Sequence, residues 1–529
     1  LTTIFSYPER PPQGIWNNSV SSLEAVRPEL LAYPATTKTV IQLVRAAEAS
    51  QQRVRMTGSG HSFSDVALND DMLLLPNRLN APLDLDRARL KPGPAADRHL
   101  VRVQGGMTVR DLNALLDSKC LALENMGGWD EQTITGVAMT ATHGSGRRFG
   151  PLVAQIASLQ MVTTGGELRQ IEPTNGITNP ATFPGFLEEA PDVPVTLVQD
   201  DDELNAVGVS MGSMGIVTAV VVRAVDKFWI RENRKVMRWS ELGNPGGYLD
   251  RMIHHPPAPG APDHVEVYIN PYETKAGDHQ CILTERYRLA AEPAPTLESR
   301  SRGALGDGAL FNDGRLRSLA EDALRIELDR ASIVTMEGIL TDFLLAMKDP
   351  NYTAESYKVF NLGAINRLRA YGIELAFPIE KTLDVVKTVF AQAKREYALG
   401  RHHSVPFSLR FVKASDCYLA MQHGRETMML EMGALVPARE SLKLLQDYEQ
   451  LFMQPPFSAR PHWGLDMSVL KSWSQVEALY GEAARAAHDA VPAETAAAAW
   501  LRVYKRLNAN GTFDGRFTDR LGISMRPKA

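Results

Sequence analysis

The sequence is poor in cysteine, in long apolar runs and in clustered charge of one sign. Its 529 residues include three cysteines, Cys120, Cys281 and Cys417, and none of them forms a CxxC pair. This excludes a disulfide framework and the usual zinc and thiol redox motifs, and the sequence predicts no metal site. The compartment stays open, because a reducing compartment and export without disulfides, with the signal removed, are both compatible.

Two further absences narrow the class of protein. No stretch approaches the roughly 20 apolar residues of a membrane-spanning helix, and the longest apolar run, 217–222, has the length of a buried strand. The net charge is −5 without a basic block, so we expect no nucleic-acid partner. Nothing in the sequence indicates a protein partner. With 44% hydrophobic and 22% charged residues, the chain is of the soluble globular type.

Hydrophobic periodicity indicates an α+β protein with more than one domain. In the first third we expect helices over 39–49 and 109–116 and strands over 53–56, 101–104, 158–163, 167–171 and 216–225. The middle should hold strands over 264–270, 281–287, 373–377, 405–412 and 426–432, a helix over 383–397 and a loop-rich stretch around 293–313. Helices are expected over 473–488 and 495–507. The predicted units are 1–225, 226–455 and a C-terminal segment, 456–529.

The sharpest local pattern is a glycine-rich turn directly after a predicted strand. Residues 55–63 have the sequence Arg-Met-Thr-Gly-Ser-Gly-His-Ser-Phe. Glycine permits positive φ, and successive backbone N–H groups in such a turn can hold a phosphate. A plain glycine turn is the alternative for this segment alone. Phe63 stands where the third glycine of an NAD-binding motif would be, which argues against NAD.

A second segment combines glycines, hydroxyl groups and small residues. It contains Gly-Gly-Trp-Asp-Glu-Gln-Thr-Ile-Thr-Gly at 127–136 and His-Gly-Ser-Gly at 143–146. Small residues let a large flat cofactor approach the backbone, although a loop and helix packed for their own sake would have the same composition. Two such segments in one unit favour a dinucleotide.

Together these segments resemble the flavin domain of the vanillyl-alcohol-oxidase superfamily, and within it the aldonolactone and alditol oxidases. The C-terminal Arg-Pro-His-Trp-Gly at 460–464 is similar to the His-Trp-Gly-Lys motif of that group, and 502–513 is similar to its closing segment. The resemblance is strong at both ends of the chain and weaker in the middle. It implies a two-domain flavoprotein: a PCMH-type FAD-binding domain, completed by the C-terminal segment, and a cap domain whose mixed or antiparallel sheet lies over the flavin.

The resemblance implies FAD as the cofactor, attached covalently through His61 to the flavin 8α-methyl group. The alternative is that His61 only packs or hydrogen-bonds near the ring. A second tether is not expected, because no cysteine stands in the second segment. The expected cofactor-binding residues are Thr57, Gly58, Ser59, Gly60, His61, Ser62, Gly127, Gly128, Thr133, Gly136, Thr140, His143, Gly144, Ser145, Gly215, Ile216, Val217 and Asn508.

Four residues are candidates for catalysis. Related polyol enzymes carry Glu-x-Arg on a cap strand, and here Ser-Leu-Arg at 408–410 keeps Arg410 but lacks the carboxylate. Glu431, on the next predicted strand, is the candidate to replace it. Glu374 matches a family carboxylate, and His462 is a further candidate base. Each has a structural alternative: a sheet-edge ion pair for Arg410, a strand cap for Glu431, a sheet hydrogen bond for Glu374 and core packing for His462.

The implied function is oxidation of a CH–OH group of an alcohol, sugar or lactone to a carbonyl. The hydride passes to flavin N5 and O2 is reduced to H2O2. Gly127 favours an oxidase, because alanine at the matching position marks dehydrogenases in the family. The alternatives are a dehydrogenase with a protein or quinone acceptor and a catalytically silent flavin-binding protein.

Departures from the family pattern predict a less polar substrate than sorbitol or an aldonolactone. Ser408 replaces a glutamate and Leu465 stands where the family has a lysine. The predicted strand 264–270 offers an apolar face made of Val265, Val267 and Ile269.

Overall fold

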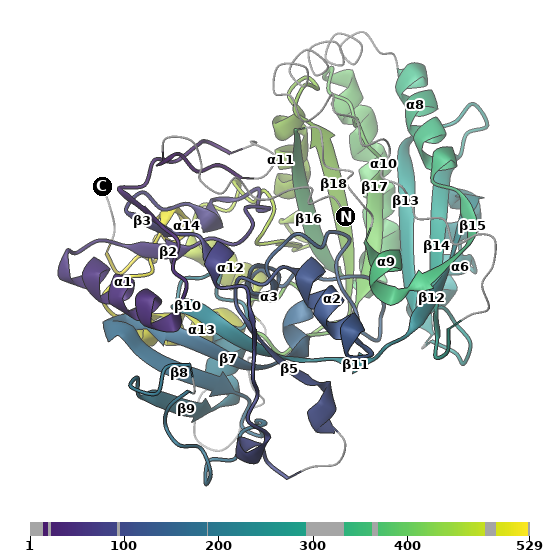
Figure 1. The fold of residues 1–529 in the computed structure, drawn as a ribbon. Coiled ribbons are helices and arrows are strands. Elements are labelled where there is room, and N and C mark those ends of the chain that lie inside the picture. Colours follow the sequence, from purple (N-terminus) through teal and green to yellow (C-terminus); the bar gives the residue numbers. More distant parts are fainter. Residues whose placement is uncertain are drawn as a thin grey trace.

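The computed structural model describes residues 14–18, 23–92, 96–187, 189–255, 257–292, 333–361, 369–481 and 494–526. The predicted loop-rich stretch around 293–313 lies outside these residues, as does the end of the helix predicted over 473–488. Two large sheets lie side by side, one in each half of the molecule (Figure 1).

The first half contains one large sheet and two small ones. The large sheet has the order β4 (Pro82–Leu83), β5 (Leu100–Gln104), β10 (Ile216–Arg223), β7 (Ile156–Thr163), β8 (Glu167–Glu172) and β9 (Val195–Gln199). Only the β8–β9 pair in it is parallel. The small sheets are the parallel trio β1 (Leu30–Ala32), β3 (Met72–Leu74) and β2 (Val54–Met56), and the pair β11 (Val225–Asp226) and β6 (Leu121–Ala122).

Helices fill the space around these sheets. They are α1 (Thr37–Ala49), α2 (Val109–Ser118), α3 (Ile134–Met139) and α4 (Asp201–Val207). In α1 the hydroxyl of Thr36 accepts the N–H of Thr39, and Val40, Val44 and Ala47 form a buried stripe. Such capping and one apolar face are what hold a helix against a sheet.

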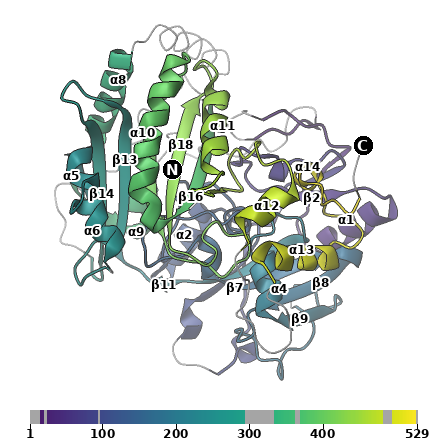
Figure 2. The ribbon, with the colours of Figure 1, turned by 180° about the vertical axis from the view of Figure 1, so that it is seen from behind.

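The second half is an antiparallel sheet of eight strands. Its order is β15 (Asp349–Glu355), β12 (Trp229–Arg238), β14 (His279–Leu289), β13 (His264–Glu273), β17 (Phe407–Val412), β18 (Thr427–Leu435), β16 (Ala370–Pro378) and β19 (Arg460–Pro461). The helices α10 (Thr382–Ala398) and α11 (Ser441–Phe452) cover one face, as the view from behind shows (Figure 2). Also in this half are α5 (Trp239–Gly243), α6 (Tyr248–His254) and α9 (Ser356–Phe360).

The helix α8 (Ile333–Ala346) lies against the opposite face of this sheet. Asn270 of β13 donates hydrogen bonds from Nδ2 to the carbonyl of Glu337 (2.9 Å) and to Thr341 Oγ1 (3.1 Å). The alternation of β13 puts Asn270 on the same side as Glu266 and Tyr268. The face of the sheet that looks toward the first half is therefore flanked by α8.

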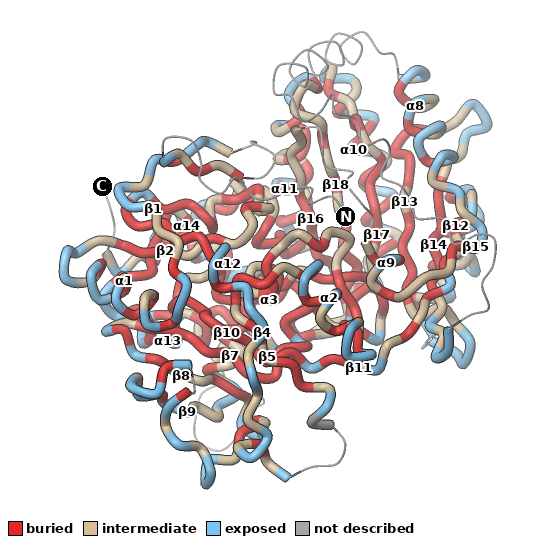
Figure 3. Tube along the Cα trace, in the orientation of Figure 1, coloured by how far each residue is buried: buried red, intermediate tan, exposed pale blue. Residues whose placement is uncertain are grey.

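The C-terminal segment returns to the first half. It forms α12 (Trp473–Leu479), α13 (Ala496–Leu507) and α14 (Arg516–Leu521). The indole of Trp500 donates to the carbonyl of Val209 at 2.9 Å. One hydrophobic cluster contains residues of both large sheets, including Leu159, Val220, Ala376 and Val412, and Figure 3 shows buried segments on either side of α3.

Most sequence expectations for the fold are confirmed. The α+β class, the antiparallel second sheet and the strands expected over 158–163 and 167–171, which pair as β7 and β8, are as predicted. The ten-residue β12 was missed, and the C-terminal segment, expected to be helical, also supplies β19 to the second sheet. The unit boundaries at 225 and 455 stay predictions. Within the described part of the chain, no helix has the length and apolar character needed to cross a membrane.

Candidate functional site

A cavity of about 770 Å³ lies between the glycine-rich segments and the second sheet. One side of it is formed by the turn after β2, the segment leading into α3 and the start of β10. The facing side is formed by the inner faces of β13, β17, β18 and β16, the loop after β19 and the end of α8.

The turn after β2 and the segment before α3 touch each other directly. The Ser59 hydroxyl donates to the Glu131 carbonyl at 2.6 Å, and Gly60 has a φ of +72°. A Cβ on Gly58 would lie 2.6 Å from Thr133 Oγ1, so this approach requires glycine. The Thr57 hydroxyl lines the cavity and is buried without a hydrogen-bond partner among the described residues. A bound group with polar atoms would satisfy it.

His61 points its ring into a partly aromatic environment. It stacks on Trp129 with 5.6 Å between ring centroids and an interplanar angle of 15°. Burial lowers the pKa of His61 to about 4. The imidazole is therefore neutral at pH 7 and keeps a nitrogen lone pair.

Nineteen of the twenty-two predicted site residues line this cavity: Thr57, Gly58, Ser59, Gly60, His61, Ser62, Gly127, Gly128, Thr133, Gly136, Thr140, His143, Gly215, Ile216, Val217, Glu374, Arg410, Glu431 and His462. The other three, Gly144, Ser145 and Asn508, are not part of its wall. A Cβ on Gly144 would collide with Asn125. Ser145 bonds to the Val265 carbonyl, and Asn508 Oδ1 accepts the N–H of Phe513 at 2.8 Å. These three contacts hold segments of the fold together.

Arg410 is the centre of the polar side of the cavity. Its guanidinium meets three carboxylates: Glu266 at 2.8 Å, Glu374 at 3.5 Å and Glu431 at 2.6 Å. Burial alone would lower the pKa of Arg410, but Glu431 and Glu266 raise it well above its usual value. Arg410 is thus a fixed cation whose direction is set from three strands.

Glu431 supplies the carboxylate that Ser408, which has only a hydroxyl group, cannot supply beside Arg410. The two residues face each other across β17 and β18, and Ser408 Oγ donates to Glu431 Oε2 at 3.1 Å. A carboxylate on the neighbouring strand therefore stands beside Arg410 in place of one on the same strand. The side chain of Glu431 is 40% exposed, which is high for a residue in this cluster.

Glu374 joins the arginine to two histidines. His143 Nδ1 donates to the Gly144 carbonyl at 2.8 Å, and His143 Nε2 lies 3.2 Å from Glu374 Oε2. Burial would raise the pKa of Glu374, but the neighbouring His143 lowers it to about 2. Glu374 is therefore an anion at pH 7 and forms a charged hydrogen-bonded link between the two halves of the site.

His462 is a hydrogen-bond donor toward the cavity. Its Nδ1 accepts the N–H of Gly464 at 2.9 Å, so in the neutral ring Nε2 carries the proton. Burial lowers the pKa of His462 to about 4, which keeps the ring neutral at pH 7. The predicted role of base is therefore not available to Nε2 in this arrangement.

The ligand atoms of His143, Glu374 and His462 lie within 4.8 Å of one another, close enough to be considered for a metal ion. A metal ligand must offer a lone pair, and Nε2 of His462 carries hydrogen instead. The group fits a hydrogen-bond network better than a metal centre.

The structure corrects one expectation and adds residues. Val265, Val267 and Ile269 lie in the core under the helices, because the sheet buries its apolar face there. The opposite face of β13 presents Glu266 and Tyr268 toward the site. Sequence reasoning also missed cavity residues such as Arg234, Phe343, Met347 and Gly372. The alternation of β13 indicated both of its faces, but only the packing shows which of them borders the cavity.

Comparisons with known proteins agree with this architecture. A family profile described as FAD binding domain matches residues 28–172, and one described as D-arabinono-1,4-lactone oxidase matches residues 220–487. The chain is 27% identical over 450 residues to L-gulono-1,4-lactone dehydrogenase of Mycobacterium tuberculosis, covering 85% of this chain and 89% of that protein. It is 29% identical over 451 residues to L-gulonolactone oxidase of Scyliorhinus torazame, covering 84% and 87%.

Among solved structures, cholesterol oxidase from Brevibacterium sterolicum superimposes with a TM-score of 0.70 at 14% identity, covering 98% of this chain and 100% of that one. This likeness shows a shared fold. The second profile spans just over half of the chain, in the part that carries the Arg410 cluster. The protein therefore belongs to the D-arabinono-1,4-lactone oxidase family of FAD-dependent oxidoreductases.

Proposed function

We propose that this protein oxidises a CH–OH group of a lactone or related hydroxy compound at an FAD bound covalently through His61, with O2 as electron acceptor. The turn after β2 (57–62) and the segment leading into α3 (127–136) together form one wall of the cavity, which we call the glycine-rich cradle. The observation that carries the proposal is that Arg410 and its carboxylates lie on the facing wall of the same cavity. The names of the relatives, lactone oxidases and a lactone dehydrogenase, support the substrate class.

The residues of the first wall suit FAD. Gly58 lets the two glycine-rich segments pack together against Thr133, Thr57 has an unsatisfied buried hydroxyl and His61 offers a neutral imidazole beside the cavity. When bound, FAD supplies the hydride acceptor and returns the electrons to oxygen.

The chain's own groups hold and deprotonate the substrate. The Arg410 guanidinium is placed to bind the reacting oxygen and to stabilise negative charge on it. Glu431 lies 2.6 Å from Arg410 and is partly exposed in the cavity, so it is placed to accept the hydroxyl proton and release it to water. His462 donates a hydrogen bond from Nε2, and Glu374 fixes the orientation of Arg410.

Anaerobic spectroscopy tests this function. Addition of L-gulono-1,4-lactone or D-arabinono-1,4-lactone should bleach the flavin absorbance, and admission of air should restore it with release of peroxide. Glu431→Gln should slow bleaching by about 100-fold or more while the protein keeps its oxidised flavin spectrum. Bleaching without oxygen uptake would favour a dehydrogenase. No bleaching by any lactone, polyol or simple alcohol would refute the proposal.

A further inference from the structure

Beyond the Arg410 cluster, the cavity continues along the sheet toward the ends of β16 and β18. Three register pairs follow one another on the cavity face: Glu374 with Glu431, Gly372 with Gly433, and Ala370 with Leu435. All six residues line the cavity. The wall thus changes from carboxylates to bare backbone to apolar side chains over four residues, which is about 14 Å in a strand.

The glycine pair in the middle leaves space that the fold does not require. Neither Gly372 nor Gly433 is among the residues with positive φ. A Cβ on Gly372 would meet no heavy atom closer than Leu465 Cδ2 at 3.8 Å, which is ordinary contact. On Gly433 it would lie 3.1 Å from Val405 Cγ2, a tighter fit. At position 372, therefore, the missing side chain enlarges the cavity without serving backbone geometry or packing.

The remaining walls at this end are mostly apolar. Leu465 borders the compartment from the loop after β19, and Val405 and Pro406 border it before β17. Phe343 and Met347 line the same cavity from the end of α8, which lies on β13, with Phe343 37% exposed. The charged residues Lys348 and Asp349 line the cavity where β15 begins, at the other edge of the sheet from β16. A polyhydroxy chain here would leave hydroxyl groups facing Leu435 and Leu465 without partners, which is unfavourable.

We propose that this compartment, lined by Ala370, Gly372, Gly433, Leu435 and Leu465, binds an apolar extension of the substrate. The substrate class is then a hydroxy lactone or alcohol whose reacting carbon lies at Arg410 and Glu431 and whose far end is an alkyl or comparable apolar group. This inference rests on the proposed function for the position of the reacting hydroxyl, and it adds the chemistry of the other end of the molecule.

Two matched lactones test the inference. One is a hydroxy-γ-lactone, and the other is the same lactone with an eight-carbon alkyl ether on its far side. Burial of each methylene is worth roughly a threefold to fourfold gain in binding. We expect the alkylated compound to have a KM lower by at least tenfold. In Gly372→Leu, which fills the compartment, the KM ratio between the two compounds should fall to near one.

A control variant with the same substitution on α8 tests whether adding a leucine side chain changes KM by itself, and a binding measurement tests the compartment without turnover. Gly338 of α8 also has open space around it but is not part of the cavity wall, so Gly338→Leu should leave the KM ratio unchanged. An alkylated lactone that lacks the reacting hydroxyl should bind to the wild type and perturb the flavin spectrum, and should bind at least tenfold more weakly to Gly372→Leu.

The outcomes separate the two proposals. If the parent lactone bleaches the flavin but the alkyl group gives no gain, the compartment is refuted and the oxidase function stands. If neither lactone bleaches the flavin but the inert alkylated analogue binds in a Gly372-dependent way, the proposed function fails and the compartment stands. An equal KM ratio in wild type and Gly372→Leu would also overturn the inference.

Discussion

At the residue scale, the environment of His61 determines what its ring can do. Burial keeps the imidazole neutral, with a pKa of about 4, and the ring lies on the cavity wall next to the left-handed Gly60. We predict that flavin fluorescence stays with the protein band after denaturing electrophoresis. The denatured His61→Ala variant should lose the flavin, whereas the folded variant should still bind FAD non-covalently through the other residues of the cradle. Free FAD in the supernatant of the acid-precipitated wild type would contradict the tether.

Gly127 gives a second prediction at this scale, about oxygen. A Cβ built there would lie 3.4 Å from the His143 carbonyl oxygen and from Thr142 Cγ2, so alanine fits without displacing the backbone. The added methyl would narrow the cavity beside the flavin cradle. In Gly127→Ala, reoxidation of the reduced flavin by O2 should slow by about tenfold or more, which is about 1.4 kcal/mol in the barrier. Stopped-flow traces should show flavin reduction by the lactone nearly unchanged, and equal reoxidation rates in both proteins would exclude the idea.

Residue roles were predictable from the sequence only in part. Local spacing indicated the glycine motifs, and the resemblance to related polyol enzymes indicated Arg410 and Glu431. The proton position on His462 depends on the N–H of Gly464, and the packing of Gly144 on Asn125 depends on two loops meeting. Such tertiary contacts leave no periodic signal in the sequence.

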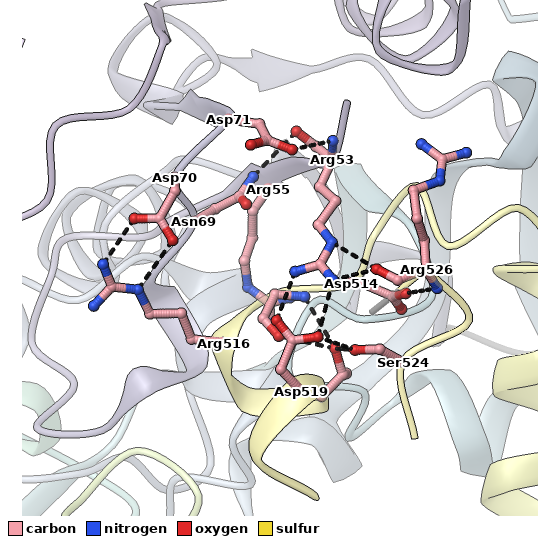
Figure 4. Close-up of polar contacts among 12 residues, drawn as sticks. Arg53, Arg55, Asn69, Asp70, Asp71, Asp514, Arg516, Asp519, Ser524 and Arg526 are labelled. Atoms are coloured by element: carbon pink, nitrogen blue, oxygen red, sulfur yellow. Dashed lines mark hydrogen bonds and ion pairs between the residues drawn. The ribbon is translucent and has the colours of Figure 1, made fainter. Parts of the chain in front are cut away.

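At the element scale, α14 binds the C-terminal segment to the start of β2, the strand that precedes the cradle. Figure 4 shows Arg53 and Arg55 of this region facing Asp514, Asp519 and Arg526. Arg53 forms two hydrogen bonds to the Asp519 carboxylate, at 2.7 and 2.9 Å, and its side chain is 3% exposed. Arg55 donates to the Phe513 carbonyl at 3.1 Å. The turn that follows β2 is therefore held in place by residues more than 450 positions away.

This contact predicts a specific loss on mutation. Asp519→Asn leaves the buried guanidinium of Arg53 without its charged partner. Removing one partner of a fully buried pair costs about 3–5 kcal/mol, and because Asp519 is 26% exposed we expect about 2–3 kcal/mol off the free energy of unfolding. Urea unfolding measures it. Asp192→Asn, which breaks an exposed pair with Lys38, is the control and should change little. Equal stability of the two variants would mean that α14 does not secure the cradle.

Two of the elements missed from the sequence, β12 and β19, escape its patterns for different physical reasons. In β12 the buried positions include Ile230, Glu232 and Arg234, so the alternation that marks a strand is carried by charged residues. Binary patterning assumes that buried means apolar, and it fails where ion pairs fill the interior. The strand β19 is two residues long, too short for any pattern.

At the scale of the whole molecule, a chain of buried ion pairs runs across four strands of the second sheet and ends at Arg410 on the cavity wall. Glu232 of β12 pairs with Arg286 of β14 at 2.7 Å, and Arg286 pairs with Glu266 of β13 at 3.2 Å. Glu266 in turn holds Arg410 of β17 at 2.8 Å. The chain starts three strands from Arg410, at about 4.8 Å per strand. This chain of ion pairs holds the Arg410 guanidinium from the side of β13, while Glu374 of β16 and Glu431 of β18 hold it from the other side.

A pair of substitutions separates the stabilising role of this chain from its effect on the reaction. Glu266→Gln and Glu232→Gln each remove a buried carboxylate between arginines, so each should lower the free energy of unfolding by about 3–5 kcal/mol. Of these two carboxylates, Glu266 contacts Arg410, at Nε, and Glu232 does not. Glu266→Gln should therefore let the guanidinium shift, and Glu232→Gln should not. A displacement of about 1 Å can slow a reaction by about 100-fold. We therefore expect anaerobic flavin reduction to slow by about 10- to 100-fold in Glu266→Gln and to stay close to wild type in Glu232→Gln, with stability measured in parallel. Equal reduction rates in the two variants would show that the ion pairs stabilise the sheet without positioning Arg410.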